Sequence, residues 1–427
     1  MKFFKQNILV KVLSVNSISV GISFVLGIFS IKIVSIFLGT PGMALMGSFR
    51  NFTSMLKSIA TLGINNSIIK LVVENKEDKA ELASIYSTFF WLFLGVSVLL
   101  GIGTICFANA ISTFLFYSSD FSIPIQFFGL ILPLIVINTF WLAIYNALEK
   151  FKKIILIQII SNILIFIVAG LLIWKKNISG GLFSVVIGEI LMIAVAFVFV
   201  IKEKEYFKFD LQKSINLKYL KSIKSFTLMA LLSAILAPLT LVFIRNNIVQ
   251  YNSIEEAGVW DAINRFSGFY MVFFNSGLSL YYLPKLASLK TDFEFKTELK
   301  SYFKIIVPIF LLMLVVIFLS KKIIIDLAFT TAFSNINQLL IWQLLGDFFK
   351  IMTLAFGYQI AVKTMMKEYF IGEIFFNVSY FLLSVYLLKS NSIEGVLEAY
   401  FYTNVVLFFL ILFFFRKILL KSDLNES

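Results

Sequence analysis

Residues 154–174 read IILIQIISNILIFIVAGLLIW, and residues 181–201 read GLFSVVIGEILMIAVAFVFVI. Both runs are almost entirely apolar, and each matches the roughly 20 residues that a helix needs to cross the hydrocarbon core of a bilayer. The short stretch between them, 175–180, begins with two lysines and ends with a glycine, as expected for a turn at a membrane surface. The pair therefore predicts two consecutive membrane-spanning helices, and the rest of the chain repeats this pattern.

The composition of the whole chain agrees with such spans. Of its 427 residues, 59% are hydrophobic and 14% are charged, and 50 are phenylalanine. Soluble globular domains are typically about 45–50% apolar and about 25% charged. Because a water-soluble core needs no such apolar excess, the composition excludes a soluble enzyme and predicts an all-α polytopic membrane protein.

Charged, glycine-marked and proline-marked stretches divide the chain into about twelve candidate spans of sufficient length. They are 11–38, 42–73, 82–108, 121–148, 154–174, 181–201, 219–245, 256–283, 302–320, 335–362, 368–388 and 394–415. The longest basic connection, between Lys202 and Lys224, separates two halves of about six spans each. We therefore expect an N-terminal six-helix lobe at 1–205, a linker at 206–218 and a C-terminal six-helix lobe at 219–427.

Basic residues are distributed unevenly between the two sides of the predicted topology. Of the 37 Lys and Arg residues, 25 fall on the side that holds both termini, five on the opposite side and seven within spans. Cytoplasmic loops of membrane proteins carry such an excess, so both termini are predicted to be cytoplasmic. The net charge of +13 is then a signal of orientation and not of nucleic-acid binding. The apolar stretch after Lys5 runs to Leu38 without a small-residue cleavage site, so we expect it to remain as the first span.

The scarcity of some side chains limits the chemistry that the chain can perform. It contains no histidine, which excludes an imidazole proton relay and a His-ligated metal. A single cysteine, Cys106, excludes an internal disulfide and a cysteine-cluster metal site. No phosphate-cradling loop is present, and no exposed loop is long enough for a catalytic domain. We expect neither a metal, nor a cofactor, nor an enzymatic activity.

Charged residues inside the spans are the strongest functional signal, because a central Arg or Lys costs about 2.5–3.5 kcal/mol on insertion scales. In the second span, polar side chains recur along one face of a helix, at Arg50, Ser54, Lys57, Thr61 and Asn65. No acidic residue lies near Arg50 or Lys57 in the sequence. This stripe therefore predicts a water-filled cavity lined by cations, which suits an anionic ligand such as a phosphate.

Other charges within spans leave alternatives open. Asp261 and Arg265, like Asp347 and Lys350, have the spacing of ion pairs within a helix, so they are either structural pairs or parts of a site. Glu189 is a single acid beside a glycine, for which packing and ion coupling are both open. Lys32, Lys70 and Arg245 lie near span ends, where a side chain can extend to the interface instead of serving function.

Several motifs resemble a known transporter family. In the first half these are IVSIFLGTPG at 33–42, SFRNF at 48–52 and GINN at 63–66; in the second half they are FTLMA at 226–230, GVW at 258–260, YLPKL at 282–286, WQLLGDFFK at 342–350 and FGY at 356–358. The first set resembles Wzx-type flippases of the multidrug/oligosaccharidyl-lipid/polysaccharide exporter superfamily. The second set resembles the enterobacterial common antigen (lipid III) flippase group. The resemblance covers nearly the whole chain with the order of spans intact.

The resemblance implies two six-helix lobes around a central cavity and an alternating-access transport of undecaprenyl-pyrophosphate-linked oligosaccharides from the cytoplasmic to the periplasmic leaflet of a bacterial inner membrane. It also implies a polysaccharide polymerase and a chain-length regulator as possible partners, besides the lipid bilayer. Recurrent charged positions of the group are matched at Arg50, Lys70, Arg245, Asp347 and Lys350. That group carries glutamine where this chain has Asp261, and Arg265 has no clear counterpart there, so an O-antigen unit and lipid III are both open as substrates.

The combined hypothesis assigns two sets of residues. Substrate binding is predicted for Arg50, Lys57, Asn65, Lys70, Arg245, Arg265 and Lys350, and ion coupling for Asp261, Asp347 and Glu189. One alternative is a multidrug or cation antiporter of the same superfamily, in which acidic residues would be expected to dominate the cavity. Another is a membrane-embedded polysaccharide polymerase or acyltransferase, for which a large periplasmic loop would be expected. A purely structural scaffold would not need cations on the faces of its spans.

Overall fold

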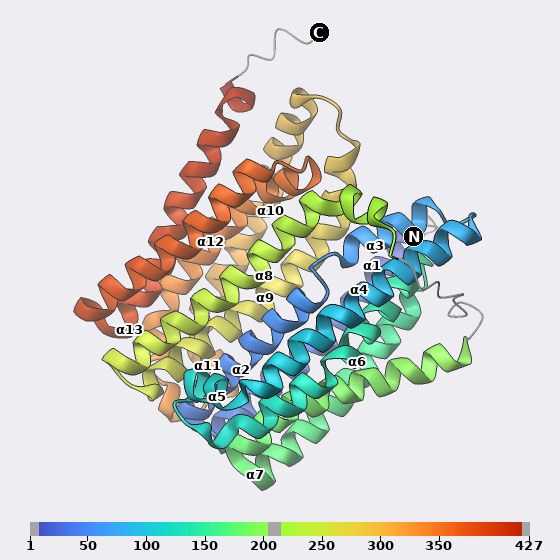
Figure 1. The fold of residues 1–427 in the computed structure, drawn as a ribbon. Coiled ribbons are helices and arrows are strands. Elements are labelled where there is room, and N and C mark those ends of the chain that lie inside the picture. Colours follow the sequence, from blue (N-terminus) through green and yellow to red (C-terminus); the bar gives the residue numbers. More distant parts are fainter. Residues whose placement is uncertain (1–7, 204–214, 421–427) are drawn as a thin grey trace. The chain divides into compact units, whose positions relative to one another are not determined.

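The computed structural model describes residues 8–203 and 215–420, and all regular structure in that part of the chain is helical (Figure 1). Seven of its helices are long and apolar enough to cross a membrane. They are α4 (Lys79–Cys106), α6 (Ser122–Ala147), α7 (Phe151–Lys202), α8 (Leu217–Tyr251), α10 (Asp292–Leu319), α12 (Ile336–Val362) and α13 (Met366–Leu420). The prediction of an all-α polytopic membrane protein is confirmed.

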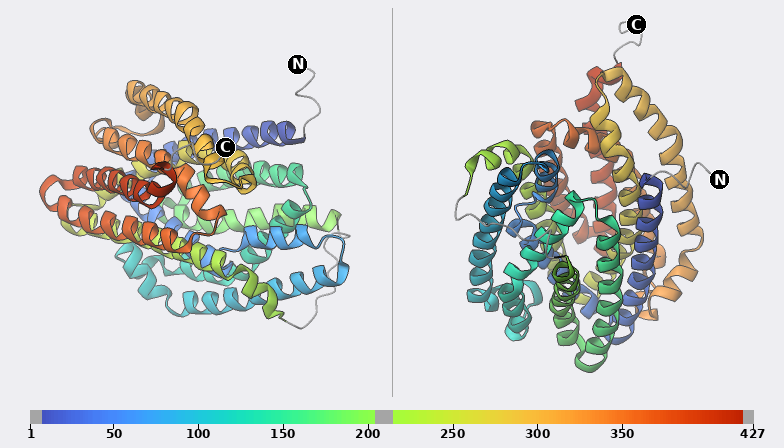
Figure 2. Two further views of the ribbon diagram at one scale, coloured as in Figure 1. Left: turned by 90° about the horizontal axis from the view of Figure 1, so that it is seen from above. Right: turned by 90° about the vertical axis from the view of Figure 1, so that its right-hand side faces the viewer.

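Two of these helices each provide a pair of the predicted spans. α7 is 52 residues long and α13 is 55, and each is interrupted by one residue with non-helical dihedral angles. The interrupting residues are Asn177, with φ 50° and ψ −131°, and Ser392, with φ 55° and ψ −146°. At these positions the chain turns back, so that each element consists of two helical arms (Figure 2). The breaks lie between the predicted spans 154–174 and 181–201 and between 368–388 and 394–415.

The predicted second span, 42–73, is divided in the structure. It consists of α2 (Gly39–Ala60) and α3 (Asn65–Glu74), and at the break Leu62 and Gly63 both adopt positive φ, 51° and 62°. A Cβ atom on Gly63 would lie 2.4 Å from the Cβ atom of Ala230 in α8. Glycine is therefore required both by the backbone conformation and by the close approach of α8.

The remaining predicted spans coincide with α1 (Ile8–Phe37) and α9 (Ile254–Ser288). The sequence did not predict the short helices α5 (Ala108–Phe116) and α11 (Lys321–Ala328), nor the 3-10 turns η1 (Ser119–Phe121) and η3 (Thr331–Phe333). These short elements follow the ends of α4 and α10, where the apolar runs stop.

The chain divides into two compact units, the first with residues 1–38 and 45–242 and the second with residues 39–44 and 243–427. In the first unit α6 packs against α4 and α7, and α1 packs against α7. In the second unit α12 is central and packs against α9, α10 and α13. α2 and α8 each run from one unit into the other. Most of the predicted linker 206–218 lies outside the described residues, and the predicted lobe boundaries stay predictions.

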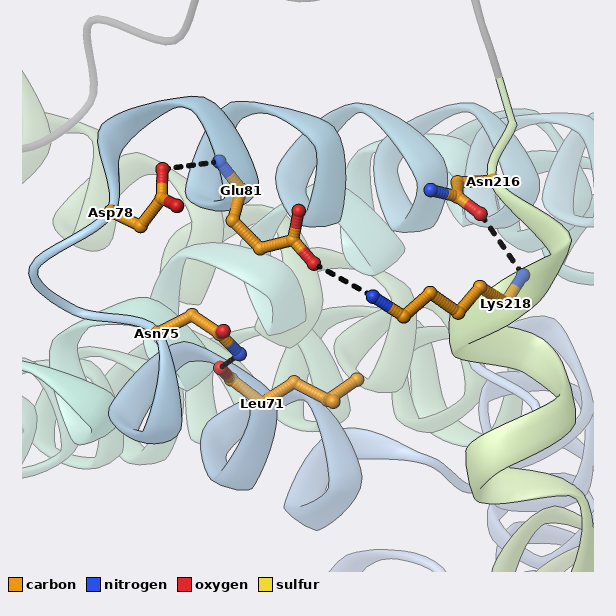
Figure 3. A network of polar contacts seen from close by, with 6 residues as sticks. All are labelled: Leu71, Asn75, Asp78, Glu81, Asn216 and Lys218. Atoms are coloured by element: carbon orange, nitrogen blue, oxygen red, sulfur yellow. Dashed lines mark hydrogen bonds and ion pairs between the residues drawn. The ribbon is translucent and has the colours of Figure 1, made fainter.

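Polar contacts attach the start of α8 to the first unit (Figure 3). The backbone N–H of Asn216 donates to Thr88 Oγ1 at 3.0 Å, and Lys218 Nζ lies 3.4 Å from Glu81 Oε1. Asp78 caps α4 by accepting from the backbone N–H of Glu81 at 3.0 Å. The N-terminal part of α4, from its cap Asp78 to Thr88, thus contacts the chain where it enters α8.

Candidate functional site

In the first unit, Lys57 of α2 forms an ion pair with Glu189 of α7, with 2.5 Å between Nζ and Oε1. The Lys57 side chain is 36% exposed and the Glu189 side chain 17%. The two residues are 132 positions apart in the sequence. No acid lies near Lys57 in the sequence, but tertiary packing provides a partner that the local sequence does not reveal.

The face of α2 that carries Lys57 is only partly covered. Arg50 is partly exposed and Ser54 is exposed, whereas Phe49 on another face is fully buried and packs edge-on against Phe116 and Phe128. Thr61, at the end of the predicted stripe, is buried and donates to the Lys57 carbonyl at 3.0 Å. The accessible polar face of α2 therefore ends near Lys57, where the helix itself ends.

The two predicted residues on α3 contribute differently. Asn65 begins α3, but its side chain lies outside the described part of the structure. Lys70 is 66% exposed and lies 3.8 Å from Glu74, one turn further along the same helix. Such an exposed pair contributes little to stability.

In the second unit, Arg245 of α8 donates to the carboxylate of Asp261 in α9. Both residues are buried, and the Arg245 guanidinium lies over the ring of Trp260, 5.4 Å from its centroid. The spacing in the sequence predicted Arg265 as the partner of Asp261, whereas the structure adds Arg245, which lies 16 residues earlier. A buried, hydrogen-bonded pair of this kind is strongly destabilised when one partner is removed.

Asp347 of α12 is fully buried and accepts hydrogen bonds from neutral donors. Ser267 Oγ donates at 2.6 Å, Tyr400 Oη at 2.8 Å and Gln343 Nε2 at 3.3 Å, and Tyr270 Oη donates as well. These donors come from α9, α12 and α13, so the carboxylate joins the helices at the centre of the second unit. Of the two alternatives for Asp347 and Lys350, the structural ion pair is not observed, because Lys350 is exposed and belongs to none of the ion pairs among the described residues.

Two further cations of the second unit are accessible. Lys350 is exposed near the middle of α12. Arg265 is partly buried, with its Nη1 atom 3.9 Å from the sulfur of Met43. Near Arg265 on the same helix, a Cβ atom added to Gly268 would meet nothing within 4 Å. The second unit therefore has accessible cations on α9 and α12, in addition to its buried carboxylates.

No group of three or more Asp, Glu, Cys or His side chains that could hold a metal ion occurs within residues 8–203 and 215–420. The charged features described above are instead accessible cations at Lys57, Arg265 and Lys350, the buried carboxylate of Asp347 and the buried pair of Arg245 with Asp261. Helices of membrane-spanning length make this a polytopic membrane protein, and charged residues within such helices are typical of substrate and ion pathways.

The chain belongs to the polysaccharide biosynthesis protein family, whose model matches residues 9–290. The lipid III flippases of Escherichia coli (strain K12) and Shigella flexneri are each 24% identical to it over 387 residues, which is 88% of this chain and 91% of theirs. The resemblance found in the sequence motifs is thereby confirmed.

Solved structures of transporters show the same fold. The lipid II flippase MurJ in an inward closed conformation is 18% identical, with a TM-score of 0.74 over 95% of this chain and 89% of MurJ. A multidrug resistance MATE family transporter of the MOP superfamily in an inward-facing conformation is 14% identical, with a TM-score of 0.76 over 95% of this chain and 96% of the transporter. The fold is therefore common to lipid flippases and drug transporters, and it does not distinguish between them.

Proposed function

We propose that this protein is a flippase that moves a polyprenyl-pyrophosphate-linked oligosaccharide from the cytoplasmic to the periplasmic leaflet of a bacterial inner membrane by alternating access. It acts as a translocator and not as an enzyme. Family membership and the match to lipid III flippases along nearly the whole chain support this function. An O-antigen repeat unit and lipid III are both retained as substrates.

The observation that carries the proposal is the accessibility of two cations, one near the middle of α12, which is long and apolar enough to span a membrane, and one in the last turn of α2. Lys350 is exposed within α12, and Lys57 is 36% exposed on α2. A lysine at the centre of a bilayer costs about 2.5–3.5 kcal/mol if it faces lipid. Water beside these residues avoids that cost, and a pyrophosphate in that water gains favourable charge–charge and hydrogen-bonding interactions.

In the first unit we assign direct contact with the anionic head group to Arg50 and Lys57, because each is at least partly exposed. In the second unit Arg265 and Lys350 are also at least partly exposed, and both stay predicted substrate contacts. Arg245 is 2% exposed, so its proposed contribution to substrate binding is indirect, through Asp261 and the position of α9. Lys70 and Asn65 stay predicted substrate contacts at the cytoplasmic end of the second predicted span.

For ion coupling, Asp347 is our first choice among Asp261, Asp347 and Glu189. Its hydrogen bonds come from hydroxyl and amide groups, whereas Asp261 and Glu189 each hold a cation. Protonation of Asp347 therefore breaks no ion pair that the structure describes. We therefore place proton coupling at this carboxylate.

The proposal has two further parts. Both termini lie in the cytoplasm, and a polysaccharide polymerase and a chain-length regulator are partners of the protein.

The function is tested by reconstituting the purified protein into liposomes with undecaprenyl-pyrophosphate-linked oligosaccharide and measuring its transfer between leaflets. Arg50→Glu is expected to abolish transfer, and surface glycan in cells, while the protein still inserts. The matched control is Lys175→Glu, which changes an exposed lysine beside the turn of α7. Transfer by Arg50→Glu at the wild-type rate would exclude Arg50 from the mechanism. Export of small cationic dyes without lipid transfer would favour the antiporter alternative, to which the MATE-like fold is equally suited.

A further inference from the structure

The ion pair between Lys57 and Glu189 has intermediate accessibility. Its nitrogen and oxygen atoms are 2.5 Å apart, and the side chains are 36% and 17% exposed. A fully buried pair cannot be opened without leaving an unpaired charge in an apolar environment. A fully exposed pair contributes little and is screened by salt. The Lys57–Glu189 pair lies between these limits, so Lys57 can exchange its carboxylate for another anion that reaches the same accessible face.

The surrounding backbone is held in place by packing. Leu56 and Ala60 on α2 are buried, and so are Leu182 and Val186 on the arm of α7 that carries Glu189. Buried side chains thus lie close to the pair on each of the two helices, and only the ends of the two side chains need to move when the pair opens. Long, flexible lysine side chains make such changes of partner easy.

The same face of α2 carries a second cation. Arg50 lies two turns before Lys57 and is partly exposed, and the exposed hydroxyl-bearing Ser54 lies between them. A pyrophosphate has several acceptor oxygens and at least two charges, so it offers more to Arg50 and Lys57 together than a single carboxylate offers to Lys57 alone. A ligand with one weak charge or none does not have this advantage over Glu189.

We propose that Glu189 is a built-in competitor for the anionic head group of the substrate. It occupies Lys57 when the site is empty and is displaced when a pyrophosphate binds. This inference rests on the proposed function of the same site and adds a specificity-determining role for Glu189. By re-forming its pair with Lys57, the carboxylate lowers the affinity for the pyrophosphate and favours release of the substrate. It also excludes lipids whose head groups are too weakly charged to replace it.

The test uses the purified full-length protein in nanodiscs, with farnesyl pyrophosphate as the probe and farnesol as the uncharged control, and compares dissociation constants at constant ionic strength. Glu189→Gln is expected to bind farnesyl pyrophosphate about three- to fivefold more tightly than the wild type, as follows from the loss of a partly exposed competing ion pair. In a Lys57→Met background the same change is expected to have no effect. Farnesol binding is expected to be the same in all variants.

Weaker or unchanged binding of farnesyl pyrophosphate by Glu189→Gln would overturn the competitor role, and so would tighter binding that persists in Lys57→Met. Glu189→Asp keeps the negative charge, but its side chain is one methylene group shorter and reaches Lys57 less well. It is expected to tighten the binding of farnesyl pyrophosphate by a smaller factor than Glu189→Gln does. This variant decides the question if Glu189→Gln does not fold. Failure of farnesyl pyrophosphate to bind the wild type would overturn the proposed function of the site as well. If it binds the wild type and the Glu189 variants with the same dissociation constant, only this inference is overturned.

Discussion

Tyr400 donates a 2.8 Å hydrogen bond to Asp347, and one edge of the Tyr400 ring lies close to the neighbouring Gly346. The phenol of α13 and the carboxylate of α12 are thus fixed by the same close approach of two helices. Tyr270 and Ser267 of α9 donate to the same carboxylate. A single acidic group therefore holds three helices of the second unit, and a change in its protonation state alters the contacts of all three.

Asp347→Asn tests whether this carboxylate couples transport to protons. The amide keeps the size of the side chain but replaces one acceptor oxygen with a donor that faces other donors, so we expect a loss of about 1–3 kcal/mol in stability. Transfer of lipid-linked oligosaccharide in liposomes is expected to lose its response to an imposed pH gradient. Asp326→Asn, at an exposed position in α11, is the matched control and is expected to retain the response. A normal response in Asp347→Asn would show that coupling, if present, lies elsewhere.

Gly346→Ala tests the packing on which this arrangement depends. An added Cβ atom would lie 2.4 Å and 2.6 Å from two carbons of the Tyr400 ring. Because both groups are on packed helices, we expect destabilisation by about 1–3 kcal/mol, measured as a lower midpoint of thermal unfolding in detergent. Gly357→Ala on the same helix is the control, since its added Cβ would meet nothing within 4 Å. Equal midpoints for the two variants would contradict the close approach of α12 and α13.

The sequence predicted the helices well and their contacts poorly, for a physical reason. Length and apolarity alone determine that 154–174 and 181–201 cross a bilayer, and the structure places a break between them at Asn177. The break in the second span was missed because it contains no proline and depends on the contact between Gly63 and Ala230. Hydrophobicity does not record such contacts.

The same limit applies to the candidate site. Their charge within apolar spans identified Lys57, Asp261 and Asp347 as unusual, but the sequence offered Asp261 and Asp347 partners only one turn away and offered Lys57 none. Their observed partners include Glu189, Arg245 and Tyr400, which lie 132, 16 and 53 residues away. Each of these partners could have been noticed in the sequence as a charged or hydroxyl-bearing residue inside an apolar span. Which of these residues contact one another is decided by tertiary packing.

Arg245 and Asp261 are expected to be a structural pair whose charges must be removed together. Asp261→Asn leaves the buried guanidinium without its carboxylate, so it should destabilise the protein by about 3–5 kcal/mol. The double variant Arg245→Met with Asp261→Asn removes both charges and should recover part of this loss. Thermal unfolding of the two single variants and the double variant measures the coupling. Additive losses would mean that the pair does not act as a unit.

The predicted orientation can be tested with the native cysteine. Cys106 is exposed at the end of α4, which the topology with cytoplasmic termini assigns to the periplasmic side. A membrane-impermeant maleimide added to cells with a permeabilised outer membrane should therefore label the wild type. The control is Cys106→Ser combined with Lys367→Cys, at an exposed position on the predicted cytoplasmic side, which should be labelled only after the inner membrane is opened. The reverse pattern would invert the topology.

Lys350 distinguishes a binding role from a structural one, because it is exposed and belongs to no ion pair among the described residues. Replacing it should leave the unfolding midpoint nearly unchanged, as is usual for substitutions that remove no packing or buried contact. Lys350→Met keeps the length of the side chain and removes its charge, and it should reduce transfer of lipid-linked oligosaccharide; Lys350→Glu adds repulsion toward pyrophosphate and should reduce it further. Lys175→Met and Lys175→Glu serve as controls for the same changes at the turn of α7. A Lys350→Met protein that unfolds earlier yet transports normally would mean that the ammonium group serves packing, and the accessible cation on α12 would then no longer support an anionic substrate.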